Sequence, residues 1–367
     1  MIFRVGSADF LSLVERCFSV CSTTNLTPIL QNVYIRTTSS GLAAVGGDGD
    51  IYLIGSMDNC LVRQHGSFIM PPKCLEVLKQ VNEEFVEIHV DKNVAYFSTS
   101  TTKWDIRVEH EEYKMPDFSK VKFDTTFERE KLISTLTKAR TAIASEIVRP
   151  AFMFIDMSGG YVQACDGSRL HRVPFPSSSN LLLSGRTANE LIKYAKKARS
   201  SNIFFSETYS HYVFQVDKDF LFATKHKIEY PDVDSFLVRP AKSNNQKLTV
   251  NRKKIISAIK QVAITADDDT KYLQIDLTQE VMYLRTSDKY FNQSYVSIPV
   301  DWRYPSRTLG VKHINFVDAL NIFDEDEIDM FFGLDSLAGK SSIYFSSGET
   351  CAVVMQLRQE FAMRNAK

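Results

Sequence analysis

The sequence has little of what marks the special classes of protein. Its 367 residues include only 15 Gly and 11 Pro, and 24% are charged against 44% hydrophobic. That composition excludes a collagen-like chain and argues against disorder or a coiled coil, because ordinary globular domains have these values. At roughly 100 to 200 residues per domain, the length predicts two or three domains, each with its own core.

Net charge is also missing, since 44 Lys and Arg balance 44 Asp and Glu. A chain of zero formal charge cannot attract nucleic acid by bulk charge, so such a partner must be met by local segregation of cations. No hydrophobic run approaches the roughly 18 residues that span a bilayer, and the first residues lack a basic leader and a cleavage site. We expect a soluble, cytoplasmic protein with no membrane partner.

The six cysteines form no CxxC pair and are spread along a chain too long to need disulfide staples, so we expect reduced thiols. Cys17 and Cys21 fall on one predicted helix with no nearby His, which favours core packing over metal binding. The acidic runs at 267–269 and 324–327 lack calcium-loop spacing and are better interpreted as solvated loops. The sequence predicts no metal site and no cofactor.

One pattern occurs three times, at intervals of about 122 residues, a third of the length. The segments 3–20, 125–143 and 248–265 align without gaps, and each continues from a short strand into apolar residues at helical spacing. An aspartate follows a strand-like run in every copy: Asp48, Asp166 and Asp288. The copies predict three domains, residues 1–122, 123–244 and 245–367.

The ends of the first two copies also match. Met115-Pro116-Asp117-Phe118 closes the first copy and Tyr230-Pro231-Asp232-Val233 closes the second.

Each copy carries a second helix pattern near its middle. In the second copy, Thr187 and Glu190 fit a capping box ahead of an apolar stripe. Equivalent helix patterns occupy 73–81 and 315–323, and strand patterns lie at 202–205 and 212–216. Two helices against antiparallel sheet in each copy predict the α+β class, and the long period indicates domains rather than solenoid turns.

Several segments, in this order and spacing, resemble a known family: Thr27-Pro28-Ile29-Leu30 with Asn32, Asp166-Gly167-Ser168-Arg169-Leu170, Phe222-Ala223-Thr224-Lys225 before Pro231-Asp232, and Val353-Val354-Met355-Gln356-Leu357-Arg358. Together with the threefold repeat they are similar, over essentially the whole chain, to the bacterial DNA polymerase III beta subunit, the sliding clamp. The resemblance implies three repeated clamp domains and a head-to-tail homodimer, a closed six-domain ring on double-stranded DNA. It also implies DNA polymerase and a clamp loader as partners. The third copy disfavours the two-domain, trimeric clamps of eukaryotes and archaea.

Basic residues gather on the predicted helices, most densely in the second copy. Taken alone, Lys193, Lys196 and Lys197 on one helix are more typical of a solvated outer face. The resemblance reverses that preference, because in clamps these helices line the hole, where cations contact phosphates without reading bases. The predicted DNA-facing residues are Lys73, Lys79, Lys138, Arg140, Lys193, Lys196, Lys197, Arg199 and Lys260.

The resemblance further implies an apolar pocket between the second and third domains for short partner peptides, which carry a Gln and aliphatic or aromatic residues. An aliphatic and Met lining with Arg donors at the rim suits several ligands. From periodicity alone, Val353 and Met355 are better explained as core residues of the last strand. Matching positions give the predicted pocket residues Arg149, Gly167, Arg169, Leu170, Pro231, Phe236, Val353, Met355, Leu357 and Arg358.

Dimer closure is assigned by the same resemblance. The strand 103–107 places Trp104 and Ile106 on one face, which suits an internal core strand and one side of an interface equally well. The resemblance makes these two residues the first-domain side of the interface and Ile264 the third-domain side.

Catalytic patterns are absent from the sequence. There is no GxSxG elbow, and the GGDGD run at 46–50 lacks the spacing of a phosphate-binding loop and favours a turn. His171, close to Asp166, is the nearest candidate for a catalytic pair, but such pairs are more often structural. The chain is therefore predicted not to be an enzyme. The alternative that stays open is a small-molecule enzyme or carbohydrate-binding protein built on repeated α+β domains, which needs a cleft with perturbed ionisable groups.

Overall fold

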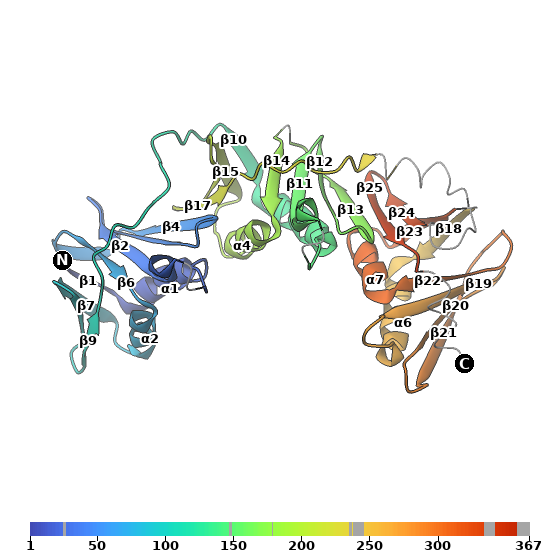
Figure 1. Cartoon of the computed structure of the whole chain (residues 1–367), viewed down its shortest axis with the longest axis horizontal. Helices are drawn as coiled ribbons and strands as arrows, with labels where there is room; N and C mark the ends of the chain where they lie inside the picture. Colours follow the sequence, from blue (N-terminus) through green and yellow to red (C-terminus); the bar gives the residue numbers. More distant parts are fainter. Residues whose placement is uncertain are drawn as a thin grey trace. The chain divides into compact units, whose positions relative to one another are not determined.

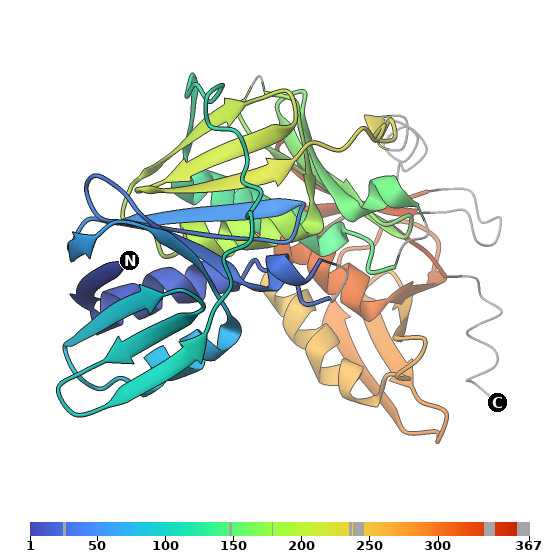
Figure 2. The same cartoon turned by 60° about the vertical axis from the view of Figure 1, so that its left-hand side comes forward.

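The computed structural model of the chain (Figure 1, Figure 2) describes residues 1–24, 27–146, 149–177, 179–234, 237, 246–333 and 342–357. In every third of the chain a short strand leads directly into a helix. The pairs are β1 (Ile2–Gly6) with α1 (Ser7–Phe18), β10 (Thr125–Glu128) with α3 (Arg129–Ala139), and β18 (Gln246–Asn251) with α6 (Arg252–Val262). The predicted start of each repeat is confirmed.

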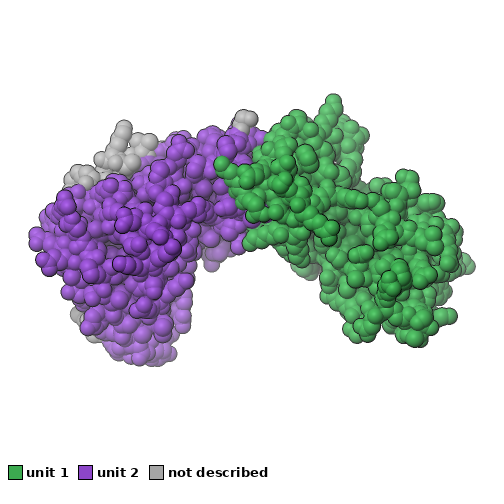
Figure 3. Space-filling model, turned by 180° about the vertical axis from the view of Figure 1, so that it is seen from behind, with its two compact units in different colours: residues 1–131, 189–226 green, residues 132–188, 227–367 purple. Residues whose placement is uncertain are grey.

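The second helix of each third is present as well. These helices are α2 (Pro72–Gln80), α4 (Gly185–Ala195) and α7 (His313–Asn321). The bounds of α2 and α7 lie within two residues of their predicted patterns. The chain forms two compact units, residues 1–131 with 189–226 and residues 132–188 with 227–367 (Figure 3). The division into domains at 122 and 244 stays a prediction.

The first unit contains two antiparallel sheets. Besides β1 and β10, its strands are β2 (Val33–Thr37), β3 (Leu42–Gly47), β4 (Ile51–Met57), β5 (Cys60–Gln64), β6 (Ser67–Met70), β7 (Phe85–Asp91), β8 (Val94–Ser98), β9 (Lys103–Arg107), β15 (Asn202–Glu207), β16 (His211–Val216) and β17 (Asp219–Thr224). Five strands follow the order β5-β1-β7-β8-β9, and eight follow β10-β15-β16-β17-β4-β3-β2-β6. The β4–β17 pairing joins strands from two different repeats in one sheet.

The second unit repeats this plan. Besides β18, its strands are β11 (Phe154–Ser158), β12 (Tyr161–Cys165), β13 (Arg169–Pro174), β14 (Leu181–Ser184), β19 (Tyr272–Leu277), β20 (Val281–Ser287), β21 (Gln293–Pro299), β22 (Arg307–Lys312), β23 (Glu327–Phe332), β24 (Ser342–Ser347) and β25 (Thr350–Met355). Eight strands follow the order β14-β11-β12-β13-β25-β24-β23-β18, and four follow β21-β20-β19-β22. Here β13 pairs with β25 across two repeats.

Short 3₁₀ helices complete the order. They are η1 (Pro28–Gln31), η2 (Arg140–Ala142), η3 (Pro150–Met153) and η4 (Ala263–Thr265).

The helices lie on the sheets by one apolar face. In α1 the buried residues Phe10, Leu13, Val14 and Cys17 recur at helical spacing, and α6 shows the same spacing with Ile255, Ala258, Ile259 and Val262. A Cβ on Gly46 of β3 would lie 2.0 Å from the carbonyl oxygen of Cys17, so only glycine admits α1 this close. Core packing of Cys17 and Cys21 is confirmed, because both are buried.

One predicted helix start is wrong. Thr187 does not cap α4, because the helix begins at Gly185 and the Thr187 amide donates to Ser184 Oγ at 3.0 Å. Ser184 is therefore the capping residue, three positions ahead of the amide it accepts from. The apolar stripe that suggested the helix is buried at Leu191, Ile192 and Ala195, whereas Ala198, its last predicted residue, lies beyond the end of α4.

The three repeated aspartates close turns. Asp48 Oδ1 accepts from the amides of Asp50 and Ile51 at 3.0 and 2.8 Å, and Asp166 and Asp288 accept from amides that follow them in the same way. A carboxylate that holds the backbone ahead of it is the ordinary use of Asp in a turn. Of the turn predicted at 46–50, residues 48–50 form it, while Gly46 and Gly47 end strand β3.

Three further features of the structure are the character of its helices, the state of its cysteines and the grouping of possible metal ligands. Among the described residues, no helix combines the length and the apolar character that crossing a membrane requires. All six cysteines are free thiols. Over the same residues, no three His, Cys, Asp or Glu side chains are grouped so that they could hold a metal ion.

Candidate functional site

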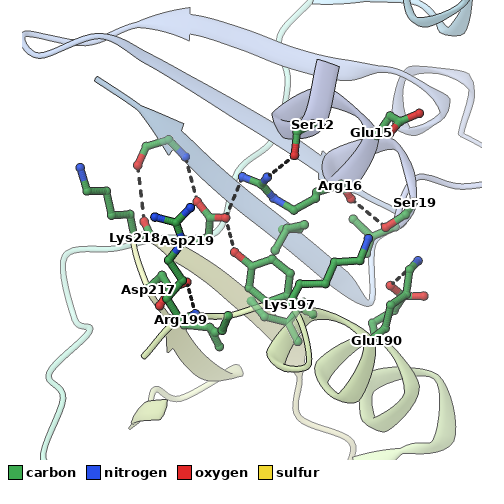
Figure 4. Close-up of a pocket in the computed structure, with 18 residues that line it drawn as sticks. Ser12, Glu15, Arg16, Ser19, Glu190, Lys197, Arg199, Asp217, Lys218 and Asp219 are labelled. Atoms are coloured by element: carbon green, nitrogen blue, oxygen red, sulfur yellow. Dashed lines mark hydrogen bonds and ion pairs between the residues drawn. The ribbon is translucent and has the colours of Figure 1, made fainter. Parts of the chain in front are cut away.

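A cavity of about 610 Å³ lies in the first unit, where the last turns of α1 and α4 approach β4 and β17 (Figure 4). Its lining includes the cations Arg16, Lys193, Lys197, Arg199 and Lys218. Four carboxylates line it as well, those of Glu15, Glu190, Asp217 and Asp219. The cavity is therefore mixed in charge rather than an anion pocket.

Asp219 joins three elements at this cavity. It is 6% exposed, and its carboxylate accepts from Arg16 Nη2 of α1 at 3.1 Å, from the Ser56 amide of β4 at 3.1 Å and from the Tyr194 hydroxyl of α4. Burial and the neighbouring Asp219 carboxylate raise the pKa of Tyr194, so the hydroxyl stays a donor at neutral pH. The first and second repeats are thus tied through one buried carboxylate, which sequence reasoning missed.

Unpaired cations remain on the exposed end of α4. Lys193 pairs with Glu190 at 3.2 Å and Lys218 with Asp58 at 2.5 Å. Lys196, Lys197 and Arg199 are exposed and form no ion pair within the described part of the chain. Cations are also favourable at a helix C-terminus, where carbonyl groups are unsatisfied. This end of α4 is the local excess of positive charge that a neutral chain needs to hold a polyanion.

The other predicted DNA-facing residues are distributed over both units. Lys73 and Lys79 of α2 are exposed and pair with Glu76 at 2.6 Å and Glu15 at 3.2 Å. Lys138 is largely covered and pairs with Asp324 at 2.6 Å. Arg140 in η2 and Lys260 in α6 are exposed. Their contact with DNA stays a prediction.

The predicted pocket residues converge on β13 and β25 in the second unit. Leu170 lies opposite Val353, and the Met355 amide donates to the Ser168 carbonyl at 2.8 Å. Leu170 and Val353 are 5% and 6% exposed and belong to an apolar cluster with Phe152, Cys165, Val233, Leu237 and Cys351, against which Tyr230 and Tyr344 pack. We call these residues the second-junction cluster. Met355 is half-buried beside it.

Arg169 is not a free rim donor. Its Nε donates to Asp166 Oδ2 at 3.1 Å and its Nη1 donates to Asp318 of α7. Burial raises the pKa of the Asp318 carboxyl, while the guanidinium of Arg169 opposes that shift. The side chain therefore holds the β12–β13 turn against α7, and its contact with a partner peptide stays a prediction.

The remaining pocket residues are more dispersed. Arg149 is exposed, with its guanidinium 5.6 Å from the ring centre of Phe152, and Gly167 adopts φ +88° in the β12–β13 turn. Pro231 and Leu357 are half-buried, and the Leu357 amide donates to the Gly310 carbonyl at 2.8 Å. Phe236 and Arg358 lie outside the described residues.

The predicted interface residues differ in exposure. Trp104 and Ile106 are half-buried and pack against the core of the first unit, which leaves their part in an interface a prediction. Their strand β9 is nevertheless the edge of its sheet, with β8 as its single partner among the described strands. Ile264 in η4 is 84% exposed.

Exposed aromatic residues also lie on β21 and in the turn before it, and sequence reasoning missed them. Tyr290 and Phe291 in the β20–β21 turn and Tyr295 on β21 are 74%, 65% and 74% exposed. Thr265 Oγ1 lies 2.6 Å from Ser294 Oγ, which holds η4 against the start of β21. We call Ile264, Tyr290, Phe291 and Tyr295 the β21 patch. Alternation of Tyr295 with polar residues was the available signal.

His171 is structural. It is fully buried on β13, where its Nδ1 lies 3.0 Å from Thr141 Oγ1, while Asp166 binds Arg169 instead. Burial, followed by the charge of Arg169, lowers the pKa of His171 to about 3. The ring is therefore neutral at pH 7, and among the described residues it has no carboxylate partner. His171 and Asp166, the nearest candidates for a catalytic pair in the sequence, do not pair.

We expect His171 to make the protein sensitive to acid. Its pKa is about 6.5 in the unfolded chain and about 3 in the folded chain. As the pH falls below 6.5 only the unfolded chain binds the proton, so the free energy of unfolding decreases by up to about 1.4 kcal/mol per pH unit until about pH 3. Urea unfolding at pH 7 and pH 5 measures this loss, which His171→Gln should reduce and the exposed His65→Gln should not. Equal losses in wild type and His171→Gln would contradict the assignment.

Comparisons with known proteins bear on the whole arrangement. Residues 1–117 match the family model described as DNA polymerase III beta subunit, N-terminal domain. No curated protein matches the chain by sequence.

Solved structures are similar over nearly the whole chain. The DNA polymerase III beta subunit of Pseudomonas aeruginosa has a TM-score of 0.85 at 16% identity, covering 98% of this chain and 100% of that one. The beta sliding clamp of C. crescentus has a TM-score of 0.88 at 16% identity, covering 98% and 99%. The beta subunit of Thermotoga maritima has a TM-score of 0.83 at 15% identity, covering 98% and 100%. The first 117 residues thus match the DNA polymerase III beta-subunit family, and the chain as a whole has the repeated α+β fold of bacterial sliding-clamp subunits.

Proposed function

We propose that this protein is a DNA sliding clamp, a ring that encircles double-stranded DNA and keeps a DNA polymerase on it. The observation that carries the proposal is the clamp-subunit fold over almost the entire chain. In this role the three repeats are three domains, and two chains supply six. The protein acts by enclosure and tethering in the cytoplasm, and catalyses no reaction.

The contact with DNA is electrostatic in this proposal. Lys196, Lys197 and Arg199 at the end of α4 contact backbone phosphates, which carry no sequence information. Such contacts release counterions and weaken steeply with salt, so they permit sliding. Enclosure supplies the persistence that this weak attraction does not.

The ring closes in the proposal by pairing of β9 of one chain with β21 of a second chain. Both are edge strands in their sheets, so each presents backbone amides and carbonyls along one side. The exposed β21 patch supports this assignment, because each of its four large apolar side chains is more than half exposed on or close to this edge strand. A head-to-tail contact of this kind forms a closed dimer.

Partner proteins bind in this proposal at the second-junction cluster. Leu170, Val353 and Met355 supply its apolar side chains, and Met adapts to several ligands. A polymerase and a clamp loader would reach the site through short peptides.

The central test is retention on DNA of two topologies. We expect the wild-type protein, after loading, to stay on nicked circular DNA and to be lost when the circle is linearised, because only a ring is released at an end. Gel filtration of the DNA with bound protein measures this. Equal retention on circular and linear DNA would refute enclosure.

The same assay separates enclosure from the phosphate contacts. Changing Lys193, Lys196 and Lys197 to Glu should lower retention, since each phosphate contact contributes about 0.9 to the slope of log K against log salt. The fold should persist because the buried face of α4 is unchanged. Exposed Lys92, Lys114 and Lys120, changed together to Glu, are the matched control for charge. Wild-type retention in the α4 variant would place these lysines away from the DNA.

A further inference from the structure

The first unit contains an apolar cluster that corresponds to the second-junction cluster. It is built around the β4–β17 pair and comprises Leu30, Val45, Ile54, Tyr113, Val213 and Phe222. Phe220, Tyr52, Tyr34 and Val121 pack against it. We call this set the first-junction cluster. Like its counterpart, it lies where two strands from different repeats pair.

Strand register makes the correspondence specific. In the first unit Tyr52 lies opposite Phe222, and Phe222 lies opposite Val213 on β16. In the second unit Leu170 lies opposite Val353, and Val353 lies opposite Tyr344 on β24. A 3₁₀ turn that starts with proline contributes Leu30 to one cluster and Phe152 to the other. Two surfaces of the same construction therefore occur in one chain.

The chain itself differs at these two places. The segment 108–124, which leads from β9 to β10, runs across the first-junction cluster (Figure 2). The Phe118 ring is 4.7 Å from the ring centre of Phe222 and 5.5 Å from that of Phe220. At the matching position of the next connector the residue is Val233. The large Phe118 ring, 38% exposed, thus lies on the first cluster, whereas the smaller Val233 is 3% exposed and is itself part of the second cluster.

The covering segment is fixed on both sides of Phe118. Tyr113 stacks on Tyr34 with ring centres 5.6 Å apart. The Ser119 amide donates to Asp117 Oδ1 at 2.8 Å, and the Lys122 amide donates to Ser206 Oγ of β15 at 2.9 Å. Phe118 is held in place by contacts that do not depend on its own ring.

We propose that the first-junction cluster is a second peptide-binding surface, and that Phe118 of the same chain occupies it and blocks it. The proposal rests on the peptide site assigned under the proposed function. A tethered occupant acts at an effective concentration on the order of millimolar, so a free peptide of micromolar affinity cannot compete well with it. The chain consequently offers a single open peptide site, although the same apolar surface occurs at both strand junctions.

The ligand class follows from the lining. With Phe118 gone, the surface presents Phe220, Phe222 and Tyr52, so it takes a short peptide with an aromatic or aliphatic anchor. Aromatic pairs in edge-to-face contact, like those Phe118 makes, favour a Phe in the peptide.

The test counts peptide sites by isothermal titration. The probe is a synthetic short peptide that carries one Gln together with Leu and Phe residues. We expect one site per chain in the wild type and two in Phe118→Val, which introduces the residue found at the matching position. Phe204→Ala removes an exposed aromatic of β15 outside the cluster and should leave one site. Should Phe118→Val lose its cooperative thermal transition, Phe118→Leu replaces it.

A variant with a weakened second-junction site separates this inference from the proposed function. In Leu170→Ala with Met355→Ala, which weakens the second-junction site, adding Phe118→Val should restore peptide binding at least tenfold.

A wild type with one site and a folded Phe118→Val variant that also has one would overturn the inference and leave the proposed function intact. A wild type with no site would instead refute the proposed peptide site. Peptide binding by Phe118→Val in that case would still support the first-junction surface, and its absence would overturn it.

Discussion

An Ile264→Asp variant should be a monomer at micromolar concentration, where the proposed ring requires the wild type to be a dimer. Ile264 is 84% exposed, so the substitution removes no core contact within the chain. In a closed dimer the same side chain would be buried, and an unpaired carboxylate there costs several kcal/mol. A loss of that size changes the dimer dissociation constant by several orders of magnitude. Sedimentation equilibrium across a concentration series measures it.

A matched control is available on the same unit. Ile314 on α7 is 43% exposed and is not part of the β21 patch, so Ile314→Asp should leave the dimer unchanged. Tyr295→Asp, on the edge strand β21, should reproduce the effect of Ile264→Asp. A wild-type dimer in both patch variants would move the interface elsewhere.

Met355→Ala combined with Leu170→Ala should weaken binding of a polymerase-derived peptide at least tenfold. The reason is that a few buried anchors carry most of the affinity in such sites. Fluorescence anisotropy of the labelled peptide gives the dissociation constant. Undiminished affinity in the double variant would place the partner site elsewhere.

The structure assigns different costs to the two substitutions. Leu170 is 5% exposed, so Leu170→Ala should also lower the free energy of unfolding by about 2–5 kcal/mol. Met355 is half-buried, and Met355→Ala should cost less stability for a similar loss of affinity. Leu273→Ala, fully buried in another sheet of the same unit, is the control that destabilises without touching the site. Peptide affinity unchanged in Leu273→Ala and reduced in Met355→Ala would separate binding from folding.

Much of the fold could be predicted because its signals are local. Apolar residues four positions apart identify α1 and α6, and the recurring Asp48, Asp166 and Asp288 mark turns whose carboxylates hold the next amides. The start of α4 was mispredicted because both Ser184 and Thr187 are good capping residues. Only backbone geometry decides which of them accepts the amide.

The site was less predictable because its contacts join distant residues. Arg169 and Asp318 are 149 positions apart, and no local pattern indicates that they meet. Phe291 is 65% exposed in a turn where its backbone φ is +64°, a conformation that the sequence does not specify. Conversely, Leu170 and Val353 were identified through resemblance alone. They lie opposite each other on two interior strands of one sheet, which explains their burial as well as a pocket does.

The two repeat-joining strand pairs, β4 with β17 and β13 with β25, have a mechanical consequence. Each joint is a ladder of backbone hydrogen bonds within a covalent chain, so it resists force along its whole length and tolerates changes of side chain. A contact between two chains has no covalent link behind it. When a loader strains the proposed ring, we therefore expect the ring to open between β9 of one chain and β21 of the other. The strand pairs inside each chain should stay intact and transmit the force.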